Sequence, residues 1–175
     1  MSSTHERPLF REEQAFVQWW IWAVVLIVAL LAWWAFVEQI VFGRPFGSNP
    51  VSDGLVWGIF VLCGLALPLF FLRSRLVTTV TPGRLEVHFR LLRRRVFEIR
   101  RIASAQPIHY RPIRQFGGWG IRYNRQLGWA YTARGREGVH LVLDDGTGFL
   151  VGSQRSGELI DALHEAGLGP AAEEG

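Results

Sequence analysis

The sequence lacks lysine, holds a single cysteine and is poor in charge, with charged residues at 19% of its 175 positions. One cysteine excludes a disulfide framework and a cluster of cysteine metal ligands. The absence of lysine excludes a P-loop nucleotide site, which needs a lysine against the phosphates. Because 49% of the residues are hydrophobic, the chain is also too apolar for an intrinsically disordered protein.

Residue patterns that are typical of catalytic or metal-binding sites are sparse as well. None of the five histidines is paired at the i, i+4 spacing of a helical zinc site. Asp144 and Asp145 precede Gly146 as a turn signal, and Ser153 lacks the second glycine of a nucleophile elbow. We therefore predict a non-enzymatic protein with no catalytic residue, no metal site and no cofactor. An enzyme with a site of unrecognised type is the last alternative.

The hydrophobic residues concentrate in two runs, 19–37 and 54–72, each 19 residues long and free of charge. A helix of about 20 residues crosses the hydrocarbon core of a bilayer, and tryptophans stand near both ends of the first run, as is typical of the headgroup level. Soluble core helices would carry a polar stripe, and a cleaved signal peptide would be shorter and end in small residues. We therefore predict transmembrane helices over 19–42 and 54–72, joined by a short external loop over 43–53.

Arginines flank this predicted hairpin unevenly. Only Arg44 lies in the loop, whereas four arginines lie outside the hairpin: Arg7, Arg11, Arg73 and Arg75. The positive-inside rule therefore places both termini in the cytoplasm. In the N-terminal segment 1–18, Pro8 and the acids that follow it predict a short interfacial helix, with a frayed terminus as the alternative.

Small residues that permit close helix packing recur in both runs: Ala29, Ala32, Ala35, Gly54 and Gly58. They predict that the two helices pack on each other, and self-association of the protein is the alternative. Pro68 lies inside the second run and cannot donate to the carbonyl of Gly64, which predicts a local kink.

The second half of the chain alternates apolar and polar residues in short segments, which is typical of half-buried strands. These segments are 76–81, 85–89, 96–99, 108–110, 120–123, 128–132 and the hairpin 139–151. Helical spacing over 156–166 follows, and 168–175 is predicted to be a disordered tail. We expect a mainly-β domain over 73–167, a small β-barrel of about seven antiparallel strands with one C-terminal helix at an open end.

Several motifs in this half carry a resemblance to known proteins: 116–122 (FGGWGIR), 128–130 (GWA), 138–143 (GVHLVL), 145–146 (DG) and 152–155 (GSQR). With these motifs the chain resembles a family of small uncharacterised bacterial membrane proteins that join two transmembrane helices to one pleckstrin-homology-like domain. The resemblance implies that fold for 73–167 and a place in the bacterial cytoplasmic membrane. It implies no activity, although domains of this fold generally bind lipid headgroups, peptides or proteins.

Charge is distributed unevenly over the predicted β domain. Residues 73–125 hold thirteen arginines against Glu86 and Glu98, a net charge of +11, whereas 126–175 have a net charge of −5. Anionic lipids attract basic residues beside a membrane span, so we expect lipid or partner binding by Arg73, Arg75, Arg93, Arg94 and Arg95. A solvated basic face is the alternative, as is an accessory or assembly subunit of a larger membrane complex.

A glycine-rich loop is the second candidate site, with His109, Gly117, Gly118, Trp119 and Arg122. We interpret its glycines as a tight turn that packs Trp119 against the sheet, and a ligand-gating loop is the alternative. Nucleic acid is an unfavoured partner, because the aromatic rings that would stack on bases are needed for the domain core: Tyr110, Phe116, Trp119 and Tyr123.

Overall fold

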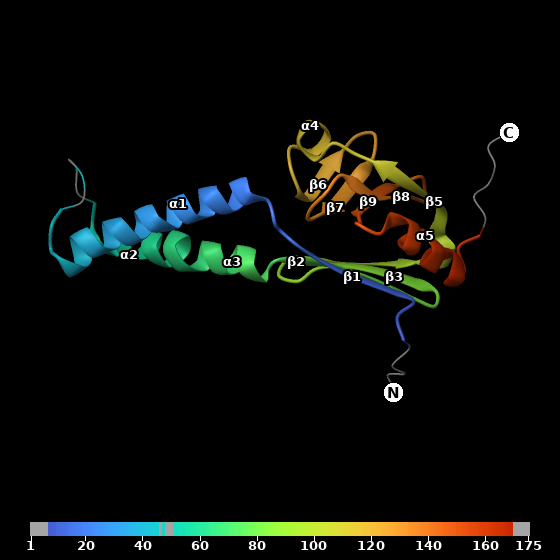
Figure 1. Ribbon diagram of the computed structural model, residues 1–175, viewed down its shortest axis with the longest axis horizontal. Coiled ribbons are helices and arrows are strands. Elements are labelled where there is room, and N and C mark those ends of the chain that lie inside the picture. The colour runs from blue at the N-terminus through green and yellow to red at the C-terminus, as the bar shows by residue number, and fades with distance from the viewer. Residues whose placement is uncertain (1–6, 46, 48–50, 170–175) are drawn as a thin grey trace. The chain divides into compact units, whose positions relative to one another are not determined.

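The computed structural model describes residues 7–45, 47 and 51–169 (Figure 1). The chain divides into two compact units. The helical unit is Phe16–Ser74, and the β unit combines the chain up to Ala15 with everything from Arg75 onward. The helical unit is therefore an insertion between the first and second strands of the β unit, which is not the contiguous domain 73–167 that we expected.

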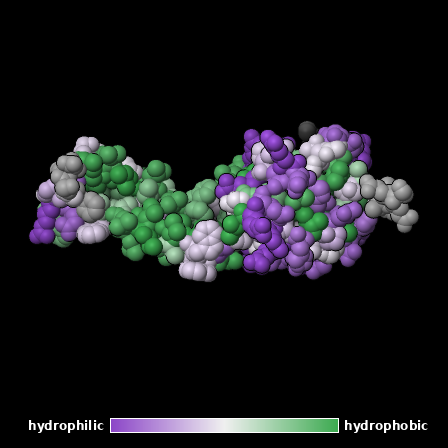
Figure 2. Space-filling model, turned by 90° about the horizontal axis from the view of Figure 1, so that it is seen from above, coloured by the Kyte–Doolittle hydropathy of each residue, from purple (hydrophilic) through white to green (hydrophobic). Residues whose placement is uncertain are grey.

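Two long apolar helices form the helical unit. The first is α1 (Trp19–Phe36), which continues as a π-helical turn, Val37–Val41. The second consists of α2 (Asp53–Ile59), a π-helical segment, Phe60–Ala66, and α3 (Leu67–Arg73). Both are long and apolar enough to span a membrane, and only 17% of the most apolar stretch of each is buried, unlike a core helix of a soluble protein. Figure 2 shows the apolar surface that results.

The two helices pack through Val25, Ala29 and Ala32 on one side and Val56, Phe60 and Gly64 on the other, all buried. Gly64 is a point of close approach between the helices, since an added Cβ would lie 3.4 Å from the Trp33 ring of α1. An added Cβ at Gly54 or Gly58 would meet nothing within 4 Å. The predicted packing through the alanines is confirmed, and the assignment of Gly54 and Gly58 to this interface is wrong because they face outward.

Two sheets make up the β unit (Figure 1). The first sheet has the order β1 (Phe10–Ala15), β2 (Arg75–Thr81), β3 (Arg84–Phe89), β4 (Arg94–Glu98), all antiparallel. The second has the order β5 (Ile102–His109), β8 (Glu137–Leu143), β9 (Gly148–Gly152), β7 (Gly128–Thr132), β6 (Gly120–Asn124). Among the described strands, β7 and β9 are the pair that runs parallel.

This architecture confirms a mainly-β domain but corrects its details. Nine strands are described rather than about seven, and they form two sheets rather than a closed barrel. The 3₁₀ turn Ile99–Arg101 carries the chain from β4 to β5 in the other sheet, so these neighbouring strands do not pair. The predicted hairpin over 139–151 and the C-terminal helix are present as β8–β9 and α5 (Ser156–Glu165).

The core lies between the two sheets. Leu76, Leu85 and Phe89 of the first sheet are buried, as are Tyr131, Leu141 and Val151 of the second. Helix α5 contacts strands of both sheets and buries Leu159 and Leu163 completely. It therefore covers apolar surface of both layers, as expected of a helix at an open end. The predicted disordered tail falls mostly on 170–175, outside the described residues.

The N-terminal segment is a strand, not the interfacial helix that we expected. Phe10, Glu12 and Gln14 of β1 are buried and alternate with exposed side chains. Glu12 accepts hydrogen bonds from the Ser153 hydroxyl, at 2.6 Å, and from the Gln154 amide, at 2.9 Å. The Gln14 side chain donates to the Gly152 carbonyl at 2.9 Å. These polar contacts, together with pairing to β2, join the N-terminus to the end of β9.

Candidate functional site

The β3–β4 turn, residues 90–93, exposes two leucines between arginines. Leu91 and Leu92 are 48% and 58% exposed, and backbone hydrogen bonds of 2.9 Å from Leu92 to Phe89 and from Phe89 to Arg93 close the turn. In the described part of the chain, neither flanking arginine forms an ion pair. The turn thus presents bare apolar side chains beside unpaired positive charge. Sequence reasoning missed the leucines, although the pattern Arg-Leu-Leu-Arg at an expected turn signals them.

The turn lies at the end of the first sheet where the chain enters and leaves the helical unit. The Arg90 amide donates to the Arg75 carbonyl at 2.9 Å, and Arg75 pairs with Ala15 of β1. Helix α1 begins at Trp19, and α3 ends at Arg73. Three residues therefore separate β1 from α1, and one residue separates α3 from β2.

The predicted arginine cluster does not form a single patch. Arg93 lies in the turn, whereas Arg94 pairs with Glu86 on the outer face of the first sheet, at 2.6 Å. Arg95 points the other way and places its guanidinium 5.9 Å from the centre of the Phe149 ring. Strand geometry explains the split, since successive side chains point to opposite faces. Arg73 ends α3 in the helical unit, and Arg75 begins β2.

The outer face of the first sheet is neutralised by ion pairs rather than uniformly basic. Besides the Arg94–Glu86 pair, Arg11 lies 2.6 Å from Glu13. The hydrogen bond from the Arg11 guanidinium lowers the pKa of the Glu13 carboxyl, which stays ionised. Two of the arginines on this sheet are therefore paired, whereas Arg90 and Arg93 of the turn are not, among the described residues.

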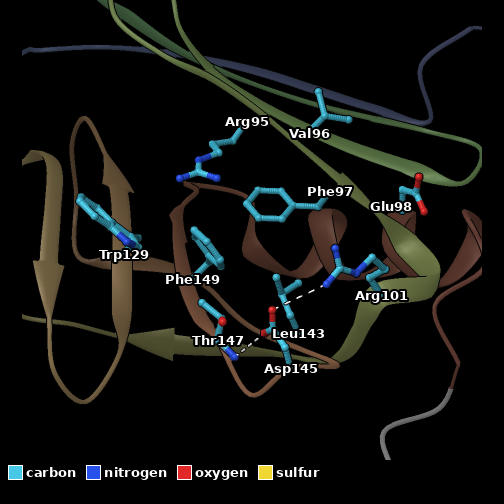
Figure 3. Close-up of a pocket in the computed structure, with 10 residues that line it drawn as sticks. All are labelled: Arg95, Val96, Phe97, Glu98, Arg101, Trp129, Leu143, Asp145, Thr147 and Phe149. Carbon is cyan, nitrogen blue, oxygen red and sulfur yellow. Dashed lines mark hydrogen bonds and ion pairs between the residues drawn. The ribbon is translucent and has the colours of Figure 1, made fainter.

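A cavity of about 520 Å³ opens between β4 and the second sheet (Figure 3). Its aromatic wall contains Phe97 and Phe149, whose ring centres are 4.8 Å apart, and Trp129. Figure 3 shows Arg95 and Phe97 pointing toward β9 while Val96 points away. The cavity thus lies between β4, the edge strand of the first sheet, and β9 of the second.

Charges in this cavity are largely balanced. Arg101 lies 3.1 Å from Asp144 and 3.6 Å from Asp145, and the hydrogen bond to Asp144 raises its pKa. The Thr147 amide donates to Asp145 at 2.8 Å, and hydrogen bonds from Thr147 lower the pKa of this carboxyl. Arg95 is the cavity arginine without an ion pair among the described residues. Arg95 therefore supplies the unpaired positive charge of this cavity.

The glycine-rich loop is a structured turn. Gly117 ends the short helix α4 (Pro112–Phe116) with a left-handed φ of 70°, and Gly118 has a φ of 131°. The Trp119 indole donates to the Gly135 carbonyl at 3.0 Å. His109 instead faces Glu137 across 3.3 Å, and Arg122 is exposed on β6. The loop is therefore a tight turn, and it joins the half-buried Trp119 to the loop between β7 and β8.

The aromatic residues considered for base stacking divide by burial. Tyr110 and Phe116 are buried with Ala130 and Leu150 in one cluster, and burial raises the pKa of the Tyr110 hydroxyl to about 12. Tyr123 is 60% exposed and contacts the Trp129 ring edge-on, with 5.4 Å between centres. Two of the four rings thus belong to the core.

Among the described residues, no group of three or more His, Cys, Asp or Glu side chains is placed to hold a metal ion. No protein-family model, curated protein or solved structure matches this chain.

Proposed function

We propose that this protein is an integral membrane protein of the bacterial cytoplasmic membrane whose β unit binds anionic lipid headgroups. The two apolar helices would cross the bilayer as a hairpin. Pairing of β1 with β2 supports a shared side for the two flanks of the hairpin, because Ala15 and Arg75 are neighbours in one sheet. The arginine distribution places that side in the cytoplasm.

The β3–β4 turn is the proposed lipid contact, and the exposure of Leu91 and Leu92 between Arg90 and Arg93 carries the proposal. Both helices join this end of the sheet through short connections, of three residues before α1 and one residue after α3. Burying an apolar side chain contributes about 1.5–3 kcal/mol when burial is complete, and each arginine near an anionic surface contributes about 1 kcal/mol. Together these terms exceed the cost of ordering a turn that its own hydrogen bonds already fix.

We further propose a pleckstrin-homology-like fold for the β unit. Two sheets with a C-terminal helix against both support it. Binding at the turn would then be surface recognition, with the leucines entering the headgroup region and the arginines contacting phosphate oxygens.

The test uses the full chain in nanodiscs, because β1 belongs to the β unit and a fragment starting at 73 would lack it. Anionic lipid should raise the melting temperature of the β unit relative to zwitterionic lipid, since a ligand that binds only the native state stabilises it. Salt should reduce the increase. The double variant Arg90→Gln/Arg93→Gln should lose most of it.

The matched control is Arg84→Gln/Arg100→Gln. It also removes two positive charges, one from the start of β3 and one from the 3₁₀ turn that follows β4. This control should keep most of the lipid-dependent increase. Equal losses in both double variants would show that net charge, rather than the turn, governs the response and would refute the proposed contact.

A further inference from the structure

Arginines surround a hollow beside α4 that shares no residue with the β3–β4 turn. The hollow has a volume of about 340 Å³ and is lined by Arg111, Pro112, Ile113, Arg114, Trp119 and Arg136. Residues 99–136 contain eight arginines and no acid. Within the described residues, the side chains of Arg111, Arg114 and Arg136 form no ion pair.

The segments that carry these arginines are held together by hydrogen bonds. The Tyr110 amide donates to the Arg136 carbonyl at 2.8 Å, which fixes the start of α4 beside β8. The Trp119 indole donates to the neighbouring Gly135 carbonyl at 3.0 Å. The Arg111 amide donates to the Gln115 side chain at 2.6 Å. The backbone that presents the hollow is therefore organised before any ligand binds.

Gly135 restricts the loop further. Its φ is +75°, and an added Cβ would lie 2.2 Å from the Gln154 side-chain nitrogen. Only glycine suits this position without rearrangement. The loop that carries Arg136 and receives the Trp119 hydrogen bond therefore packs closely against the Gln154 side chain.

Three arginines line one hollow, and in the described part of the chain none of their side chains is within ion-pair distance of a carboxylate. A phosphate group would compensate them, because guanidinium and phosphate form paired, charge-assisted hydrogen bonds. The hollow also has an apolar wall, formed by Trp119, Pro112 and Ile113. An inorganic anion has no apolar group to pack against this wall. We propose that this hollow binds the phosphate of an organic phosphate whose remaining part packs on that wall.

The first test measures binding of inorganic phosphate to the full chain in zwitterionic nanodiscs by equilibrium dialysis. We expect saturable binding to one site, which chloride at equal ionic strength does not abolish. Arg111→Gln and Arg136→Gln should each weaken binding about tenfold or more. Arg122→Gln, with the same charge change on exposed β6 outside the hollow, should weaken it less than threefold. Non-saturable binding, or an equal loss in all three variants, would overturn the site.

A second test addresses the apolar wall by comparing phenyl phosphate with methyl phosphate. Phenyl phosphate should bind several-fold more tightly to the wild-type protein, and Trp119→Leu should reduce this preference. Equal affinities for the two phosphates in the wild-type protein would overturn the assignment to an organic phosphate.

The source of the phosphate is resolved with nanodiscs that contain anionic phospholipid. If a lipid headgroup supplies the phosphate, these nanodiscs should compete with phenyl phosphate and raise its apparent Kd. If a soluble compound supplies it, the Kd should match that in zwitterionic nanodiscs. None of the variants in these phosphate-binding tests changes a residue of the β3–β4 turn. Failure of the phosphate site can therefore be distinguished from failure of the proposed lipid contact.

Discussion

The indole of Trp33 donates a hydrogen bond of 3.2 Å to the carbonyl oxygen of Gly64, linking the two apolar helices. Pro68, four residues after Gly64, has no N–H to offer this carbonyl. The π-helical segment Phe60–Ala66 contains Gly64 and ends two residues before Pro68. The irregularity predicted at Pro68 is therefore a site of contact between the helices.

Trp33→Phe should destabilise the helical unit by about 0.5–1.5 kcal/mol, because the ring is kept while the interhelical hydrogen bond is lost. Unfolding of the full chain in bicelles by added denaturing detergent measures the change. Trp19→Phe is the control, since Trp19 is 80% exposed. Equal effects at both positions would show that the hydrogen bond contributes nothing.

Gly64→Ala should be less stable than Gly58→Ala in the same assay. Both changes gain helix propensity, worth up to about 1 kcal/mol. Only Gly64→Ala crowds the interface, because its Cβ would lie 3.1 Å from the Phe60 ring and 3.4 Å from the Trp33 ring of the other helix, while Gly58 faces open space. A reversed order would place the helix interface on the Gly58 side.

Glu12→Ala should destabilise the β unit by about 2–3 kcal/mol, because it leaves the Ser153 hydroxyl and the Gln154 amide without their acceptor. Glu13→Ala is the matched control, since its exposed pair with Arg11 is worth less than about 1 kcal/mol. Chemical denaturation followed by near-ultraviolet circular dichroism measures both. Similar small losses would mean that β1 is held by strand pairing alone.

The β unit should lose stability at alkaline pH through Tyr110. Its pKa is raised by burial to about 12, from 10.0, so the unfolded chain releases this proton first and stability falls as pH rises through that window. The loss between about pH 9 and pH 11 is roughly 1 kcal/mol. The absence of lysine keeps this window free of ammonium titration. Tyr110→Phe should flatten the decline, and an unchanged slope in that variant would assign it to another group.

The sequence predicts some parts of this structure better than others, for physical reasons. The apolar helices and the β8–β9 hairpin were predictable, because hydrophobic length and alternation are local properties. Strand β1 was not, since its buried face contains Glu12 and Gln14, whose partners lie about 140 residues away. A buried charge with distant partners resembles a solvent-exposed one in sequence.

The candidate site was predicted only in part for a related reason. The arginine triplet was visible, but its division between two faces of β4 depends on where the strand begins. The hollow beside α4 also needs Arg136 brought next to Tyr110 by backbone pairing across 26 residues. The number of arginines can be counted in the sequence, whereas the fold decides which of them line the same hollow.

The most direct test of the account measures the depth of the β3–β4 turn in the membrane. Cys63→Ser removes the single native thiol, and a fluorophore is attached at Leu91→Cys or, as the control, at Arg84→Cys near the opposite end of β3. Quenching by lipids with nitroxides near the headgroup reports depth in anionic nanodiscs. We predict strong quenching at position 91 and little at position 84. Equal, weak quenching at both positions would contradict the claim that this turn contacts the membrane.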